Sequence, residues 1–212
     1  KMIKNYFYND FFFKKIIKKK KDKRVINEYK KIKKYKKMIK FVYQNKPLGT
    51  GHAVLKTKKL IKDNFFLMLL PDDLIIKKNC SKSMILIHKR YKASVMASMN
   101  VKKNTVSRWG IYEMKNKISN SNFVIKDVIE KPSIANAPSN KAVIGRYILP
   151  KSIFNKLAKQ KKGKGGEIHI TDAIRSLVKD KNIFIGHNFA GKYLDCGTMN
   201  GYIKSSLEIS KI

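Results

Sequence analysis

The segment NFFLMLLPDDLI (residues 64–75) decides how the fold of this chain is interpreted. It is a continuous apolar run that stops at Pro71 and is followed at once by two carboxylates, Asp72 and Asp73. Apolar runs without alternating polar residues are typical of strands that are covered on both faces of a parallel sheet. The run therefore predicts such a strand inside an α/β domain, with the two aspartates at its carboxyl end.

On either side of this run, strand patterns alternate with helix patterns. This alternation favours an α/β domain with a mostly parallel, mixed sheet. Farther along, three strand patterns follow one another without an intervening helix, which predicts an antiparallel β subsection. Strands are expected at residues 38–44, 64–75, 94–101, 108–114, 123–132, 142–150 and 182–189, and helices at 49–61, 81–93, 151–159, 171–180 and within 193–209. Thr171 is the expected N-cap of its helix.

Length and composition favour a single domain. The 212 residues, 43% of them hydrophobic, are enough to bury a real core. We expect a lysine-rich helical or loop segment over 1–37 and the folded core over 38–212. No apolar run is long enough to span a bilayer, and the first residues lack the pattern of a signal peptide. Cys80 and Cys196 have neither disulfide-framework nor metal-ligand spacing, so a reducing cytoplasm fits best.

The net charge of +35 raises the question of a nucleic-acid partner. Eighteen of the 49 basic residues lie in the first 46 positions, which contain only three acids. Basic side chains that neutralise phosphates supply affinity for nucleic acids. Most of these residues are lysines, however, and few are the arginines that read base edges with two hydrogen bonds. Lys, Asn and Ile are abundant throughout the chain, so we favour a genome-wide composition bias, and we expect neither a nucleic-acid nor a membrane partner.

Acidic side chains also follow other expected strands. A carboxylate at such a strand end suits Mg²⁺, which is commonly shared with substrate phosphates, although the Pro-Asp-Asp sequence can equally be an ordinary turn. Asp195 precedes a glycine turn and the final helix, where an N-cap is the alternative. Glu130 and Lys131 end another strand, and Glu167 lies among glycines, where helix capping competes. Acids at three strand ends, together with glycine turns, favour one shared site.

The stretch PLGTGHAVL (47–55) places Gly49 and Gly51 before an apolar helical pattern. Glycines before a helix often mark a site for an anion or a nucleotide, because free backbone N–H groups point out of the helix start. They also occur in ordinary turns, and the residues alone favour that simpler interpretation.

Six segments carry a family resemblance: YQNKPLGTGHAVL (43–55), LLPDDLI (69–75), RWGIYE (108–113), VIEKPSIANAPSNKAVIGRYIL (128–149), GKGGEIHITDAI (163–174) and LDCGTMNGYI (194–203). In this order they resemble the bacterial UTP–glucose-1-phosphate uridylyltransferases, or UDP-glucose pyrophosphorylases, of the nucleotidyltransferase superfamily. The most specific part is the succession of EKP, APSN and GRYIL before GEIHITDAI. The resemblance extends from about Lys4 to the C-terminus and implies the Rossmann-like fold of that superfamily.

The resemblance implies roles for residues around the nucleotide and a metal ion. Gln44 would hydrogen-bond the uracil edge, with Gly49 close behind it. Asp72 would bind Mg²⁺, and Asp195 would be the second ligand.

It also implies roles around the sugar and the phosphates. Glu130 would accept hydrogen bonds from glucose hydroxyls, and Lys131 would reach phosphate oxygens. Lys192 is a weaker candidate for the same task, and Glu167 would shape the site near the sugar. Gly110 and Gly145 would line the glucose pocket with Glu130.

The implied reaction converts UTP and glucose 1-phosphate into UDP-glucose and pyrophosphate. The glucose 1-phosphate oxygen is already an anion, so positioning and charge stabilisation suffice and no general base is required. The first strand and the glycine-rich triphosphate loop of the family do not occur in this sequence. We therefore expect a fragment of a longer cytoplasmic enzyme, a homo-oligomer at full length. The alternatives are a thymidylyl- or guanylyltransferase and a non-catalytic relative that binds a sugar nucleotide.

Overall fold

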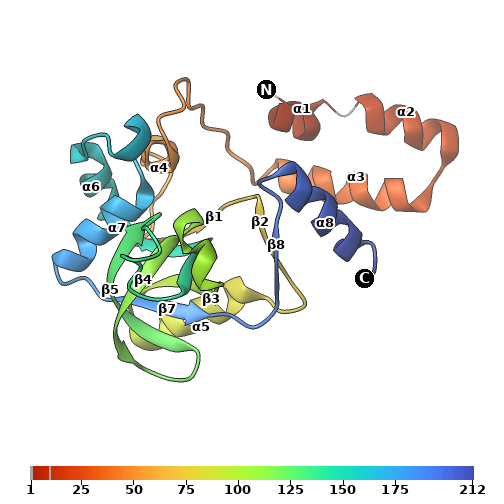
Figure 1. The fold of residues 1–212 in the computed structure, drawn as a ribbon. Coiled ribbons are helices and arrows are strands. Elements are labelled where there is room, and N and C mark those ends of the chain that lie inside the picture. The colour runs from red at the N-terminus through yellow and green to blue at the C-terminus, as the bar shows by residue number, and fades with distance from the viewer. Residues whose placement is uncertain (1, 10) are drawn as a thin grey trace. The chain divides into compact units, whose positions relative to one another are not determined.

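The computed structural model describes residues 2–9 and 11–212, and the chain divides into two compact units, Lys1–Asn45 and Lys46–Ile212. We name them the N-terminal unit and the C-terminal unit (Figure 1). The boundary lies at Asn45, whereas the sequence suggested that the lysine-rich segment ends at residue 37.

The N-terminal unit contains the helices α1 (Met2–Tyr8), α2 (Phe11–Lys20) and α3 (Lys23–Lys36). Asp22 caps α3, because its side chain accepts a hydrogen bond from the backbone N–H of Arg24 at 2.7 Å. Aromatic rings make several of the contacts between helices; the Phe13 ring stacks on Tyr29 with centroids 6.2 Å apart. Exposed lysines of the run at 14–24 lie on α2 and at the start of α3, as solvated positions.

The prediction of a strand at 38–44 is wrong. These residues follow α3 as a turn and then as irregular chain, up to the helix that begins at Thr50. A strand requires a neighbouring strand for its backbone hydrogen bonds, and the described residues of the N-terminal unit contain none.

The C-terminal unit is an α/β structure with five α-helices and eight strands among its described residues. The strands are β1 (Phe65–Leu69), β2 (Asp73–Ile76), β3 (Ser94–Asn100), β4 (Gly110–Lys117), β5 (Asn122–Glu130), β6 (Lys141–Pro150), β7 (Phe184–Asn188) and β8 (Lys192–Asp195). The α-helices are α4 (Thr50–Lys56), α5 (Cys80–Tyr91), α6 (Ile153–Lys159), α7 (Ile170–Lys179) and α8 (Met199–Ile209). In the described part of the chain, no helix is both long and apolar enough to cross a membrane.

Six strands form one mixed sheet in the order β1-β6-β3-β7-β5-β4, and β2 pairs separately with β8. The expected α/β class with a mixed sheet is confirmed, as is the antiparallel pairing of β4 with β5. Parallel pairing is rarer than the sequence suggested, since among the described strands only β3 and β7 pair in parallel. The reason is that β6 lies between β1 and β3 and runs antiparallel to both.

Both faces of the sheet are covered. On β3, Met96 belongs to a buried cluster with Leu157 of α6 and Ile174 of α7, whereas Val95 packs in a second cluster with Met84 of α5. Successive side chains of a strand point to opposite faces, so the two clusters lie on opposite sides of the sheet. Figure 1 accordingly shows α6 and α7 on one side of the strands and α5 on the other.

The apolar run at 64–75 forms two strands with a turn at Pro71 and Asp72 between them. β1 is the outermost strand of its sheet, so Leu67 and Leu69 are 37% and 50% exposed. The expectation of one strand covered on both faces is therefore wrong. What the run does supply is a pair of strands that presents the aspartates at the bend.

Candidate functional site

The two-stranded sheet brings two of the predicted carboxylates together. Asp73 begins β2 and lies opposite Asp195 at the end of β8 in the antiparallel register. Asp73 Oδ2 accepts a hydrogen bond from the Gly145 backbone N–H at 2.7 Å, and Oδ1 accepts one from the Tyr193 hydroxyl. Asp73 therefore links β2 to β6 and to β8.

The environment of Asp73 and Tyr193 raises the pKa of both groups. Burial raises the pKa of Asp73, although the hydrogen bonds from Tyr193 and Gly145 act in the opposite direction. Burial, and then the hydrogen bond to Asp73, raise the pKa of Tyr193. The hydroxyl therefore stays protonated and donates a hydrogen bond to the Asp73 carboxylate. The pair is thus suited to holding position rather than to exchanging protons.

Asp72 and Asp195 converge on the space beside Gly197. An atom at the position of a Cβ on Gly197 would lie 2.9 Å from Asp72 Oδ2 and 3.3 Å from Asp195 Oδ1. The Cys196 backbone N–H donates to the Asp72 carbonyl at 2.7 Å and ties the two segments together. Carboxylate oxygens of two aspartates beside one glycine fit a Mg²⁺ ion, which typically takes one or two carboxylates and leaves other positions to water and phosphates. Within residues 2–9 and 11–212, no cluster of three or more potential metal-ligating side chains occurs.

A cavity of about 250 Å³ lies next to these carboxylates in the C-terminal unit. Six of the residues singled out from the sequence line it: Asp73, Gly110, Glu130, Lys131, Gly145 and Glu167. The sequence reasoning missed other lining residues, which include Thr50, Arg108, Trp109, Tyr147 and His169. Arg108 and Trp109 precede Gly110 within the RWGIYE segment, so their position beside a predicted glycine was the available signal.

Glu130 is fixed at one end of this cavity. It lies opposite Gly110 in the β4–β5 register, and a Cβ on Gly110 would come within 3.2 Å of Glu130 Oε2. The Thr171 hydroxyl donates to the same oxygen at 3.0 Å. The expected capping role of Thr171 is wrong, because α7 begins at Ile170 with His169 as its N-cap. The side chain instead orients a carboxylate across the cavity.

Gly145 lies where β6 passes closest to the bend between β1 and β2. A Cβ at this position would collide with Asp73 Oδ2 and lie 2.5 Å from Leu70 Cβ. The absence of a side chain lets the backbone N–H reach Asp73 and keeps the cavity open.

Lys131 leaves the sheet directly after Glu130. It has a left-handed backbone with φ of 46°, and its N–H donates to the Trp109 carbonyl at 3.0 Å. The bend places an exposed cation at the cavity, beside the Glu130 carboxylate.

Gly49, the N-cap of α4, and Gly51, in the first turn of that helix, have a packing role. Gly49 has a φ of 94°, and a Cβ there would lie 2.9 Å from the Glu167 Cβ. The backbone N–H of Gly51 donates to the Ile168 carbonyl at 2.8 Å. This close contact places Glu167 and Thr50 at the same cavity.

Five predicted site residues do not line the 250 Å³ cavity: Gln44, Gly49, Asp72, Lys192 and Asp195. Lys192 lines a larger hollow of about 740 Å³ together with Asp195, and its ammonium group pairs with Glu208 of α8. Arg108 borders both hollows and lies 3.8 Å from Asp195 Oδ2. Gln44 belongs to the N-terminal unit, and its contact with uracil stays a prediction.

Asp195 does not cap the final helix. Thr198 is the N-cap of α8, and its hydroxyl accepts a hydrogen bond from the Gly201 N–H at 3.1 Å. Asp195 Oδ1 instead accepts one from the Gly197 N–H at 2.9 Å. Its other oxygen remains directed toward Arg108.

The chain belongs to the nucleotidyl transferase family, whose sequence model matches residues 3–212. A protein of Pseudomonas aeruginosa named UTP–glucose-1-phosphate uridylyltransferase is 35% identical over 169 residues, which are 78% of this chain and 60% of that protein. A protein of Streptococcus pyogenes serotype M3 named UTP–glucose-1-phosphate uridylyltransferase 2 is 36% identical over 173 residues, 79% of this chain and 58% of its own length.

Solved structures show the same similarity. A UDP-glucose pyrophosphorylase complexed with UDP-glucose aligns with a TM-score of 0.80 and 38% identity, over 87% of this chain and 71% of that one. A UTP-bound enzyme of the same name from Acinetobacter baumannii aligns with a TM-score of 0.79 and 29% identity, over 98% and 72%. The nucleotidyltransferase type of fold is therefore confirmed. The chain spans about three fifths of the length of the curated relatives that it matches.

Proposed function

We propose that this chain is part of an enzyme that transfers a uridylyl group from UTP to glucose 1-phosphate, giving UDP-glucose and pyrophosphate. The observation that carries the proposal is the convergence of Asp72 and Asp195 beside a cavity that Glu130, Gly110 and Gly145 line. Relatives with this named activity share more than a third of their residues with the chain over the aligned part. Its cysteines, Cys80 and Cys196, are free thiols, which fits a reducing cytoplasm.

The cavity provides complementary contacts for a sugar nucleotide. Glu130, oriented by Thr171, offers a carboxylate to sugar hydroxyls, and charge-assisted hydrogen bonds of this kind are among the stronger ones. Gly110 and Gly145 allow the ligand to approach the backbone closely, and Glu167 closes one side. Gly49 of the same unit would lie next to the uracil.

The phosphates need positive charge around them. Lys131 lines the cavity and would contact phosphate oxygens, and Lys192 would contribute only if its pair with Glu208 opened. Asp72 and Asp195 are the residues that would hold Mg²⁺, which when bound neutralises charge on the triphosphate. In the transfer, an oxygen of glucose 1-phosphate forms a bond to the α-phosphorus of UTP as the bond to pyrophosphate breaks.

The test combines binding with turnover. Titration calorimetry would measure UDP-glucose binding without metal, and a pyrophosphate-release assay on the full-length protein would measure turnover with UTP, glucose 1-phosphate and Mg²⁺. We expect E130Q to weaken UDP-glucose binding about tenfold or more, because a charge-assisted hydrogen bond is lost. D72N should abolish turnover while metal-free binding is retained.

Matched controls are available on the same unit. Glu113 pairs with Lys126 on an exposed part of β4 and β5, so E113Q should change neither measurement. Asp63 is exposed and lies before β1, so D63N is the control for D72N. Turnover that prefers dTTP or GTP over UTP would contradict the uridylyl assignment. UDP-glucose binding without any turnover in the full-length protein would favour a non-catalytic relative.

A further inference from the structure

One arginine bridges the ends of the turn that carries Asp72. Arg146 lies opposite Leu69 in the β1–β6 register. Its Nη1 donates to the carbonyl of Leu70 at 2.8 Å, and its Nη2 donates to the carbonyl of Asp73. The same guanidinium therefore bonds the chain immediately before and immediately after Pro71 and Asp72.

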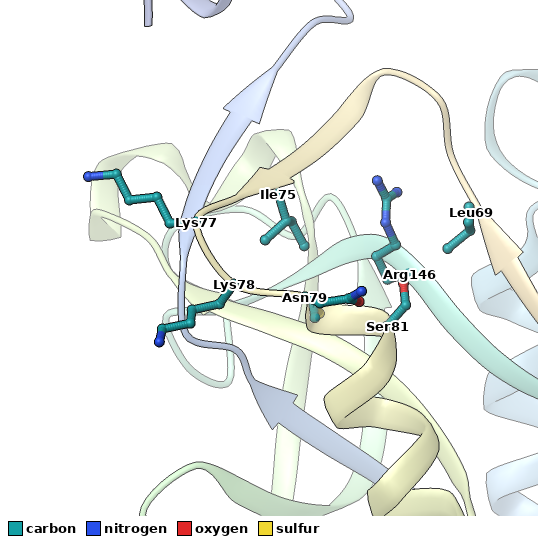
Figure 2. A pocket seen from close by; sticks show the side chains of 8 residues that line it. Leu69, Ile75, Lys77, Lys78, Asn79, Ser81 and Arg146 are labelled. Atoms are coloured by element: carbon teal, nitrogen blue, oxygen red, sulfur yellow. The ribbon is translucent and has the colours of Figure 1, made fainter. Parts of the chain in front are cut away.

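Figure 2 shows this arrangement from close by. The Arg146 side chain rises from its strand beneath the loop that runs between Leu69 and Ile75, with the guanidinium directed toward that loop. Arg146 lines a cavity of about 390 Å³ together with Lys77 and Lys78. The side chains of the two lysines extend away from Arg146. An anion site would require these three cations to converge on a common point, and they do not. We therefore infer the role of Arg146 from its hydrogen-bond partners.

Other contacts complete the turn around Asp72. The Leu70 N–H donates to the Gly145 carbonyl at 2.8 Å, and that carbonyl also accepts from Arg146 Nη1 at 2.8 Å. The Asp73 carboxylate is bound by Gly145 and Tyr193. With its own carbonyl bonded to Cys196, the Asp72 backbone is fixed on both sides and beside Asp195. The orientation of the Asp72 carboxylate toward Gly197 follows from this fixed backbone.

We propose that Arg146 is a positioning residue, which holds the 70–73 turn so that Asp72 and Asp195 share one divalent cation. The inference rests on the proposed function, because that function supplies the reason for a cation at this place. Arginine suits the task because its planar group offers five donors in a fixed fork, whereas lysine offers a single rotatable ammonium. Groups that orient metal ligands commonly affect metal affinity about 10- to 100-fold when they are replaced.

The experiment follows Mn²⁺ binding by electron paramagnetic resonance, with the protein saturated with UDP-glucose. We expect R146K to weaken Mn²⁺ binding about 10- to 100-fold while its metal-free affinity for UDP-glucose stays within about twofold. R146A should lose Mn²⁺ affinity as well and regain part of it when guanidinium ion is added at non-denaturing concentration. Arg90, whose guanidinium lies over the Tyr91 ring on α5, provides the matched control, and R90K should bind Mn²⁺ normally.

The outcomes separate the two proposals. If the unaltered chain does not bind UDP-glucose, the proposed function fails. If UDP-glucose binds and R146K keeps the unaltered affinity for Mn²⁺, the positioning role fails. An equal loss of UDP-glucose and Mn²⁺ affinity would also overturn it, since that pattern indicates general structural damage. Trimethylamine N-oxide in all samples favours the folded state, and thermal unfolding would show that each variant is folded.

Discussion

At the scale of single residues, adjacent aspartates of one turn have different tasks. Asp73 is bonded to β6 and β8 through Gly145 and Tyr193 and is partly removed from water. The Asp72 carboxylate is instead directed toward Gly197, beside the Asp195 carboxylate. Only the first arrangement fixes a strand pair, and only the second leaves a carboxylate available to a cation.

The raised pKa of Asp73 predicts a pH dependence of stability. Because burial raises this pKa, the folded state binds more protons than the unfolded state from about pH 4 up to the folded-state pKa. The contribution of Asp73 to stability is therefore complete below that window and is lost as the pH rises through it. D73N removes the titrating group.

Urea unfolding of the unaltered chain and of D73N, at a series of pH values from about 4 to about 7, checks this. We expect the free energy of unfolding of the unaltered chain, relative to that of D73N, to fall as the pH increases. A difference that stays constant across the range, or that rises, would show that the pKa of Asp73 is not raised.

A second residue-scale prediction concerns Gly145. In G145A the new methyl group would collide with Asp73 Oδ2 and crowd Leu70, so the β1–β2 bend must shift. Overpacking of this kind lowers the free energy of unfolding by about 1–3 kcal/mol. We also expect weaker UDP-glucose binding, measured by calorimetry.

The control for this variant is G166A. Gly166 has a positive φ of 72° but nothing within 4 Å of an added Cβ. G166A should lose only the backbone cost of about 1–2 kcal/mol for a left-handed alanine, and its ligand binding should be unchanged. Normal UDP-glucose affinity in G145A would show that the bend can move without affecting the cavity.

At the scale of elements, α7 connects the core to the cavity. Leu177 is only 2% exposed and packs in the larger core cluster, while Thr171 in the first turn bonds Glu130. L177A should lower the free energy of unfolding by about 2–5 kcal/mol, because it leaves a cavity in the core. Denaturant titration measures this, with K179A at the exposed end of α7 as the control. If L177A lost less free energy of unfolding than K179A, α7 would not depend on the packing of Leu177 in the core.

The sequence predicted most elements of the C-terminal unit, because their apolar patterns are local. It could not predict that β6 separates β1 from β3, since strand order depends on contacts between distant segments. The same limit applies to the site. Asp72, Glu130 and Gly145 were found through motifs, whereas the bond between Arg146 and the Leu70 carbonyl joins residues 76 positions apart. Thr171 was misassigned because a threonine at a helix start is usually a cap.

At the scale of the whole molecule, the charge of +35 predicts only non-specific attraction to polyanions. The chain has five arginines, and Arg108, Arg146 and Arg175 are already bonded within the C-terminal unit. Lysine lacks the planar, forked guanidinium group of arginine. Lysines therefore attract phosphates but do not distinguish one base from another.

Fluorescence anisotropy with duplex DNA of unrelated sequences tests this. We expect weak binding that disappears as salt is raised from about 50 mM to about 200 mM, because released counterions supply its affinity. Tight binding to one sequence that persists at the higher salt concentration would instead favour a nucleic-acid partner.

The position of β1 at the margin of the six-stranded sheet has a consequence for the behaviour of concentrated solutions. Its sequence, FFLML, carries no charge, and such edges are sites at which separate molecules can join their sheets. Mutual repulsion between highly charged molecules opposes that contact, and it weakens once salt shortens the screening distance to about 10 Å or less. Colloidal stability should therefore decline as electrolyte is added, and the resulting precipitate should be rich in intermolecular β-structure.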